Sequence, residues 1–300
     1  MEKHQINFTT QSFQQHGWLY QYPSCFASEA VEANPVGNDG DKQRLLLIHG
    51  AGVAGELTWT FITNYLDQWQ EVLVIDLAGM GGSRFINAPQ QVAVGDFSHQ
   101  IEELLAALDW HRFDVAGYSF GGMVAVDYLE RCLAGVFSNA LFLIEPAMLF
   151  SQSAQVLRQK GREYQSIAEA VRKTPDDIAV YRRFLDSVSP NRRANPQVDQ
   201  MTMTRLSASP DSFAQVLQAV HDHLDEHAER FCDWHSPWPG GSFVGGLSPQ
   251  SMMLRHQLLS QRSADWQFHT IAGADHSLVF TKPRAIARKM NEIKAGLLGR

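Results

Sequence analysis

The sequence predicts an α/β protein with a mostly parallel sheet, helices on both faces and an inserted helical segment. Short apolar runs without polar alternation recur from about residue 44 to 145 and again after 236. Longer amphipathic stretches separate these runs. Because both faces of a parallel sheet are covered, its strands are continuous apolar runs, and the longer stretches between them are helices.

The elements can be assigned in chain order. The first 26 residues favour β structure and predict an antiparallel hairpin at the sheet edge, and the polar residues 29–41 predict a surface loop. The expected strands that follow cover residues 44–49, 71–76, 113–118, 139–145, 242–247 and 266–271. The expected helices cover residues 58–69, 94–108, 120–132, 249–262 and 283–298.

The alternation of strand-like and helix-like runs stops between residues 148 and 235. Helical patterns there are interrupted by prolines, which begin or end helices. We therefore expect a core formed by residues 1–147 and 236–300, with residues 148–235 inserted as a helical cap or lid. The alternative is a helical layer that only adds stability.

Composition excludes several classes of protein. The chain of 300 residues is 44% apolar and carries a net charge of -7, which suits one α/β domain with an insertion and disfavours nucleic acid as a partner. The first residues lack the apolar segment of a signal peptide, and no apolar run is long enough to span a membrane. We expect a cytoplasmic protein, and the sequence does not predict its oligomeric state.

No metal or cofactor site is expected. Cys25, Cys132 and Cys232 are far apart, which is untypical of a zinc site or a disulfide framework. His223 and His227 have the i, i+4 spacing of a metal pair, but the acidic residues around them favour a solvated helix.

The stretch Gly117–Gly121 reads Gly-Tyr-Ser-Phe-Gly and joins an expected strand to an expected helix. This is the pattern of a nucleophile elbow, in which a tight turn exposes one serine at the carboxyl edge of the sheet. Small residues at Gly117 and Gly121 let the strand and the helix approach closely. Ser119 is the predicted nucleophile.

A serine hydroxyl needs a base within hydrogen-bond reach. Among twelve histidines, His276 directly follows the last expected strand, so it lies at the same sheet edge as Ser119 and follows it in chain order. We therefore expect His276 to be the base.

Two backbone N–H groups are expected to stabilise the oxyanion of the tetrahedral intermediate. One belongs to Phe120, the residue after the nucleophile. The other is assigned to Ala51 in the loop after the first core strand, with Gly52 as the alternative. His49 is expected to support this loop by hydrogen bonding.

Four segments in order make the chain resemble the α/β-hydrolase fold superfamily, in the serine-nucleophile branch with a helical cap. They are His49-Gly50-Ala51-Gly52, Asp76–Ser83, Gly117–Gly121 and Gly273–His276. The resemblance implies the fold and a catalytic triad of nucleophile, base and acid. It leaves the substrate open because this fold supports many reactions.

The triad acid departs from the family pattern. The family's aspartate usually follows the seventh strand, where this chain has Ser248. The family's other position is the end of the sixth strand, where Glu145 stands. We assign Glu145 as the acid, with Asp275 as the competitor and a pair without any acid as a third possibility.

A serine nucleophile with an oxyanion hole predicts acyl transfer through an acyl-enzyme. The expected substrate is a small carboxylic ester, thioester or lactone, which corresponds to EC 3.1. The superfamily's dehalogenases and epoxide hydrolases use an aspartate nucleophile and are disfavoured. Two alternatives are a carbon–carbon bond hydrolase or lyase and a non-catalytic receptor for a small ligand. The residues expected to line an apolar acyl pocket are Met148, Leu149, Phe150, Phe184, Leu185, Met201, Met203, Leu206 and Phe213.

Overall fold

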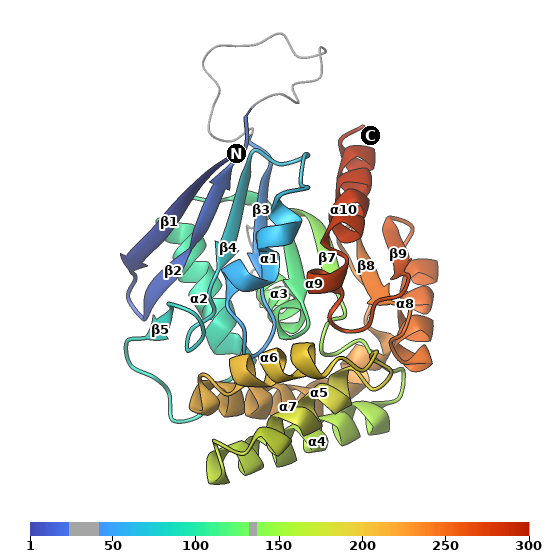
Figure 1. Cartoon of the computed structure of the whole chain (residues 1–300). Helices are drawn as coiled ribbons and strands as arrows, with labels where there is room; N and C mark the ends of the chain where they lie inside the picture. Colours follow the sequence, from blue (N-terminus) through green and yellow to red (C-terminus); the bar gives the residue numbers. More distant parts are fainter. Residues whose placement is uncertain (24–41, 132–136, 300) are drawn as a thin grey trace.

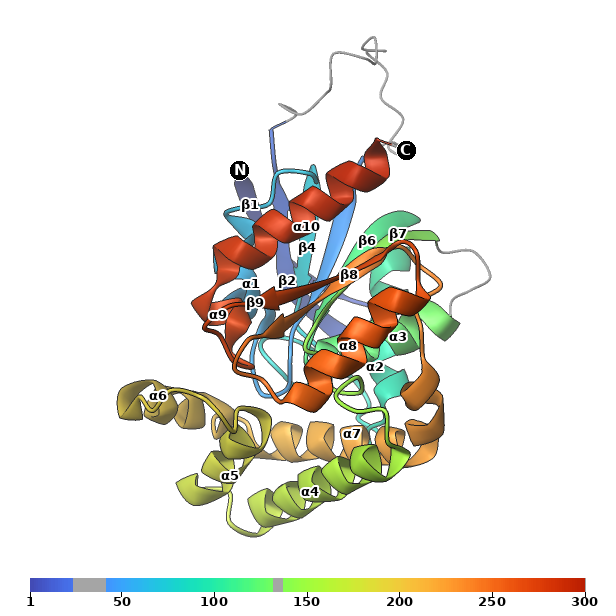
Figure 2. The same cartoon turned by 90° about the vertical axis from the view of Figure 1, so that its right-hand side faces the viewer.

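A single mixed sheet forms the centre of the molecule, and helices cover both of its faces (Figures 1 and 2). The computed structural model describes residues 1–23, 42–131 and 137–299, and within them nine strands join this sheet. They are β1 (Glu2–Thr9), β2 (Phe13–Gln21), β3 (Arg44–Ile48), β4 (Glu71–Ile75), β5 (Arg84–Phe85), β6 (Arg112–Tyr118), β7 (Phe137–Ile144), β8 (Gly240–Gly245) and β9 (Trp266–Ile271). Their order is β1-β2-β4-β3-β6-β7-β8-β9, with β5 paired to β2.

The strands from β4 to β9 in this order pair in parallel, whereas the β1–β2 hairpin adds to β4 antiparallel. Side chains alternate between the faces of each parallel strand. In β3, Leu46 and Ile48 pack on the side of α2 (Val94–Ala107) and α3 (Phe120–Arg131). Leu45 and Leu47 pack on the other side, which carries α1 (Gly55–Thr63), α9 (Leu278–Thr281) and α10 (Pro283–Leu298). The predicted sheet with both faces covered is confirmed.

The helix expected at residues 58–69 is displaced, since α1 covers Gly55–Thr63. An aspartate outside the helix explains where α1 begins, because the Gly55 N–H donates to Asp76 Oδ1 at 2.7 Å. Trp69 is not helical, and its indole donates to buried Asp114 at 2.6 Å. Strand β5 and helix α9 were not predicted from the sequence. The loop expected at residues 29–41 and residues Cys25 and Cys132 lie outside the described residues.

Four helices lie between β7 and β8 in the chain and across the carboxyl edge of the sheet (Figure 1). We call them the inserted helices: α4 (Ala154–Lys173), α5 (Ile178–Val188), α6 (Pro196–Leu206) and α7 (Pro210–Asp233). Their buried face joins the core on the α2–α3 side, for example through Leu157 and Leu217.

The end of α7 is held against the sheet layer. The buried Arg255 of α8 (Gln250–Arg262) donates to the carbonyl of Phe231 at 2.9 Å, and the Trp234 indole donates to Glu130 of α3 at 2.8 Å. The Arg255 bond satisfies one of the carbonyl groups that a helix end leaves free. None of the helices in the described residues is both long and apolar enough to cross a bilayer.

Candidate active site

Ser119 lies in a strained turn between β6 and α3, with φ of 53°. Two glycines allow the turn to form. A Cβ at Gly117 would lie 2.4 Å from the Gly121 carbonyl oxygen, and a Cβ at Gly121 would lie 2.3 Å from the Ile48 carbonyl oxygen. Both distances are far below van der Waals contact, so any larger residue would push the helix off the sheet. The tight turn between a strand and a helix that the sequence predicts is present, and Ser119 is only partly buried while its neighbours are buried.

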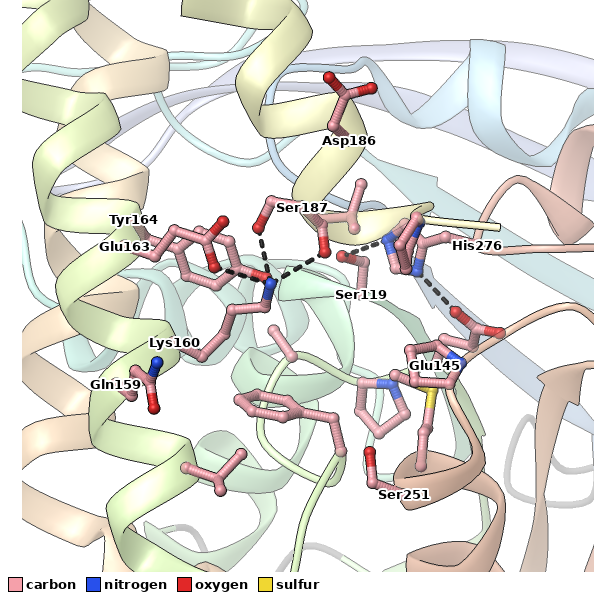
Figure 3. A pocket seen from close by; sticks show the side chains of 18 residues that line it. Ser119, Glu145, Gln159, Lys160, Glu163, Tyr164, Asp186, Ser187, Ser251 and His276 are labelled. Atoms are coloured by element: carbon pink, nitrogen blue, oxygen red, sulfur yellow. Dashed lines mark hydrogen bonds and ion pairs between the residues drawn. The ribbon is translucent and has the colours of Figure 1, made fainter. Parts of the chain in front are cut away.

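Ser119, His276 and Glu145 form one chain of hydrogen bonds at the carboxyl edge of the sheet (Figure 3). His276 Nε2 is 3.1 Å from Ser119 Oγ, and His276 Nδ1 is 2.8 Å from Glu145 Oε2. Ser119 follows β6, Glu145 follows β7 and His276 lies in the loop after β9. The structure therefore brings together the three residues assigned from the sequence, at the distances that a nucleophile, a base and its orienting group need.

The Glu145 carboxylate is fully buried and held by three atoms of other residues. Its Oε1 accepts hydrogen bonds from the Gly245 N–H at 2.7 Å and from the Ser248 hydroxyl. Its Oε2 contacts the imidazole of His276. Burial of a carboxylate is costly unless it is hydrogen-bonded, and here both oxygens are occupied. Sequence reasoning identified Ser248 as the residue in place of an aspartate but did not predict that it donates to Glu145.

Asp275, the competing acid, makes a local contact instead. Its Oδ1 accepts a hydrogen bond from the Ser277 N–H at 2.8 Å. This bond stabilises the turn that carries His276.

Tyr118 supports the position of His276 and was missed by sequence reasoning. The two rings lie 5.1 Å apart at an interplanar angle of 32°, and the Tyr118 hydroxyl donates to the His276 carbonyl at 2.9 Å. Burial, helped by the charges of Glu145 and Asp275, raises the pKa of the Tyr118 phenol well above its usual value. The phenol therefore remains a donor at physiological pH. Its only sequence signal is its place beside Ser119.

The two expected oxyanion donors lie on adjoining loops beside Ser119. A Cβ at Gly50 would be 3.3 Å from the Cβ of Ser119, so the loop carrying Ala51 approaches Ser119 closely. Phe120 begins α3 directly after Ser119. Within the described residues, the N–H groups of Ala51 and Phe120 donate to no protein acceptor.

His49 supports this loop, as expected from the sequence. Burial lowers its pKa, so the ring is neutral. The Leu77 N–H donates to His49 Nε2 at 2.9 Å, which assigns the ring proton to Nδ1, and Nδ1 then donates to the Gly50 carbonyl at 2.7 Å. Asp76 similarly braces the turn after β4 by accepting from the Gly82 N–H at 2.8 Å.

Two cavities meet at the hydrogen-bonded pair of Ser119 and His276. One has a volume of about 440 Å³ and the other about 140 Å³, and both are lined by Ser119, Val188 and His276. The expected apolar pocket is only partly correct. Phe150, Phe184, Leu185 and Leu206 line the cavities, but Met148, Leu149, Met203 and Phe213 are fully buried in the core, and Met201 is exposed.

Lys160 of α4 crosses the larger cavity, a feature that no sequence pattern indicated (Figure 3). Its ammonium donates to Ser187 Oγ at 2.7 Å, to the Ser187 carbonyl at 2.9 Å and to Glu163 Oε2 at 2.8 Å. A lysine ammonium has three N–H groups, so these bonds engage all of them. Lys160 thereby ties α4 to the end of α5 above Ser119.

Comparison with known proteins gives one family. The model described as "Alpha/beta hydrolase family" matches residues 45–289. A protein of Mycobacterium tuberculosis described as uncharacterized is 35% identical over 89 residues, which are 30% of this chain and 25% of that protein. This chain thus matches only a quarter of the length of that relative.

Solved structures of low sequence identity share the fold. Haloalkane dehalogenase DbeA from Bradyrhizobium elkani is 14% identical with a TM-score of 0.73, covering 99% of each chain. An esterase from Exiguobacterium antarcticum is 14% identical with a TM-score of 0.69, covering 97% of this chain and 100% of that one. Epoxide hydrolase CorEH is 17% identical with a TM-score of 0.68, covering 99% of this chain and 100% of that one.

Proposed function

The chain belongs to the alpha/beta hydrolase family, and we propose that it is a serine hydrolase that cleaves a carboxylic ester through an acyl-enzyme. The observation that carries this proposal is the unbroken series of hydrogen bonds from Ser119 Oγ through His276 to Glu145. The N–H groups of Ala51 and Phe120 supply the oxyanion hole.

In the first half-reaction, Ser119 Oγ attacks the carbonyl carbon while His276 Nε2 takes the hydroxyl proton. Glu145 stabilises the imidazolium that forms, and the two N–H groups stabilise the negative carbonyl oxygen. When the intermediate collapses, the bond to the leaving oxygen breaks and His276 donates its proton to that oxygen. The acyl group remains on Ser119.

In the second half-reaction, His276 removes a proton from water and the resulting hydroxide attacks the acyl carbon. The second intermediate expels Ser119 Oγ, which recovers its proton from His276. The products are a carboxylic acid and an alcohol, and the site returns to its starting protonation state.

The serine also argues against two reactions of structurally similar proteins, haloalkane dehalogenation and epoxide hydrolysis. Attack by a serine hydroxyl on an alkyl halide or an epoxide would leave an ether on the enzyme. An ether has no carbonyl carbon for water to attack, so the enzyme would not turn over. An acyl ester on Ser119 has such a carbon.

The position of the inserted helices over the carboxyl edge of the sheet supports a division into core and cap (Figure 1). In this proposal residues 1–147 and 236–300 form the hydrolase core and residues 148–235 form the cap. The cavities between the two parts are where the substrate would bind.

A fluorophosphonate probe tests the proposal, because it reacts covalently only with an activated serine. We expect stoichiometric labelling of Ser119 in the folded protein and none in a Ser119→Ala variant or after heat unfolding. A folded wild-type protein that stays unlabelled would contradict the proposal.

A further inference from the structure

The two cavities lead in different directions from the nucleophile. Of their lining residues they share only Ser119, Val188 and His276 within the described part of the chain. A carbonyl carbon bonded to Ser119 has an acyl group on one side and a leaving group on the other. The two halves of an ester would therefore occupy different cavities, and each cavity limits one half.

The smaller cavity suits a compact apolar group. Its volume is about 140 Å³, and the apolar side chains around it include Val53, Phe184, Leu206 and Phe280. The exposed Arg205 also lines it. An apolar protein cavity of about 150 Å³ holds one benzene molecule, so the complementary group has about six carbon atoms.

The larger cavity suits a longer, mostly apolar group that carries no negative charge. Its apolar lining includes Phe150, Val156 and Met252. Its volume is about 440 Å³, and its polar lining includes Gln159 and Ser251. The one cation among its described lining residues is Lys160, whose three N–H groups are engaged by Ser187 and Glu163. An anion would therefore find no available cationic donor there.

Carboxylates at the mouth also disfavour anions. The side chains of Glu163 and Asp186 line the larger cavity and are 43% and 56% exposed. Each has a cationic partner, Lys160 for Glu163 and Arg192 for Asp186, but Arg192 does not line the cavity. The lining thus carries more negative than positive charge.

We propose that the substrate is an ester with two unequal halves, the larger of which is uncharged. One half is apolar and no larger than about six carbon atoms, and it occupies the smaller cavity. The other half is larger, carries no negative charge and occupies the cavity beneath Lys160. This inference rests on the proposed ester hydrolysis, and it excludes acyl-coenzyme A thioesters because their phosphates are anionic.

Two substrate series test the size limit. One varies the acyl chain of p-nitrophenyl esters from two to twelve carbons, and the other varies the alcohol with the acyl group held constant. We expect kcat/KM to fall by about tenfold or more beyond about six carbons in one series only, as overfilling a packed pocket does. In a third comparison, a neutral ester should react about tenfold faster than its analogue with a carboxylate in the larger half.

A matched pair of variants tests whether the smaller cavity sets the limit on chain length. Thr202 and Thr204 lie on α6 and each donates to a carbonyl four residues earlier, but only Thr202 lines the smaller cavity, while Thr204 is exposed. Thr202→Trp should shift the limit to shorter chains, whereas Thr204→Trp should behave as wild type. Labelling of Ser119 by a small fluorophosphonate confirms that each variant is folded.

The outcomes separate this inference from the proposed function. Suppose that Ser119 reacts with the probe and esters are cleaved. The unequal-halves inference is then wrong if both series tolerate every chain length, if the anionic ester is preferred, or if the two tryptophan variants behave alike. If neither the probe nor any ester reacts, the proposed function itself is wrong.

Discussion

Two of the three residues of the proposed triad have backbone conformations that are unfavourable for a residue with a side chain. Ser119 has φ of 53° and Glu145 has φ of 41°. Each such residue costs on the order of 1–3 kcal/mol, so the surrounding contacts must over-determine it. For Glu145 those contacts are the Gly245 N–H, the Ser248 hydroxyl and the His276 ring. The strain is concentrated where the proposed chemistry requires fixed geometry.

Replacement of Glu145 by glutamine tests its proposed role as the acid of the triad. Glutamine retains the shape but cannot stabilise the imidazolium, so we expect kcat for an ester to fall by about 10³- to 10⁴-fold with little change in KM. Asp275→Asn is the matched control and should stay within about tenfold of wild type, because Asp275 contacts the Ser277 N–H. A greater loss in Asp275→Asn than in Glu145→Gln would reverse the assignment. Thermal unfolding of both variants verifies the fold.

Ser248 should act through Glu145. Ser248→Ala removes one of two donors to Oε1, and a hydrogen bond to a charged group is worth about 1.5–3 kcal/mol, so we expect kcat to fall by about tenfold or more. Ser248→Thr retains the hydroxyl and should recover most of the activity.

A double-mutant cycle provides the decisive measurement. If Ser248 works only by holding the carboxylate, Ser248→Ala should have little further effect on kcat in the Glu145→Gln background. Fully additive losses would show that Ser248 acts on something else.

At the scale of elements, the glycines of the elbow determine how closely β6 and α3 approach. Gly121→Ala would place a Cβ 2.3 Å from the Ile48 carbonyl oxygen, so we expect a loss of about 3 kcal/mol in the free energy of unfolding. Gly296 lies in α10 with no atom within 4 Å of its Cβ position. Gly296→Ala should instead stabilise the protein by up to about 1 kcal/mol. Urea unfolding measures both, and equal effects would contradict the packing argument.

The long elements were predictable because their patterns are local. Strand β9 and helix α10 have the predicted bounds, and the other parallel strands differ by at most about two residues from expectation. Strand β5 and helix α9 cover two and four residues, too few for a periodic pattern. The predicted helix was wrongly extended to Trp69 because its apolar residues read as a continuing face, whereas the Trp69 indole is held by Asp114.

The candidate site was predictable where topology determines it. Residues that follow parallel strands meet at one edge, which is why Ser119, Glu145 and His276 lie together as expected. Contacts between distant segments have no local signature. The Ser248–Glu145 bond joins residues 103 positions apart, and Lys160 meets Ser187 from another helix.

At the scale of the whole molecule, the proposed substrate site lies between two parts of the chain that are packed into one core. The buried cluster that contains Leu141 of β7 also contains Leu157 of α4 and Leu259 of α8. Helix α8 thus contacts both the sheet and the inserted helices, and Arg255 on it holds the end of α7. Loss of packing at α8 should therefore affect the stability of the whole molecule.

The histidine next to Arg255 makes this stability dependent on pH. His256 is fully buried, its ring stacks on Phe268 at 6.0 Å, and burial together with the charge of Arg255 lowers its pKa from 6.5 to about 3. Between these two values the unfolded chain binds a proton that the folded protein does not. The free energy of unfolding therefore falls as the pH drops below about 6.5, by about 2 kcal/mol at pH 5 relative to neutral pH.

His256→Leu removes this proton-linked term, so the loss of stability between pH 7 and pH 5 should become smaller by about 2 kcal/mol. His111, whose side chain is 75% exposed, is the control, and His111→Leu should leave the difference unchanged. Urea unfolding at pH 7 and pH 5 measures this difference in the free energy of unfolding for each variant. The remaining slope in His256→Leu would come from other buried histidines, of which His223 has a pKa lowered by burial to about 4. An unchanged slope in His256→Leu would mean that the ring is protonated in the folded core or that α8 opens locally before the molecule unfolds.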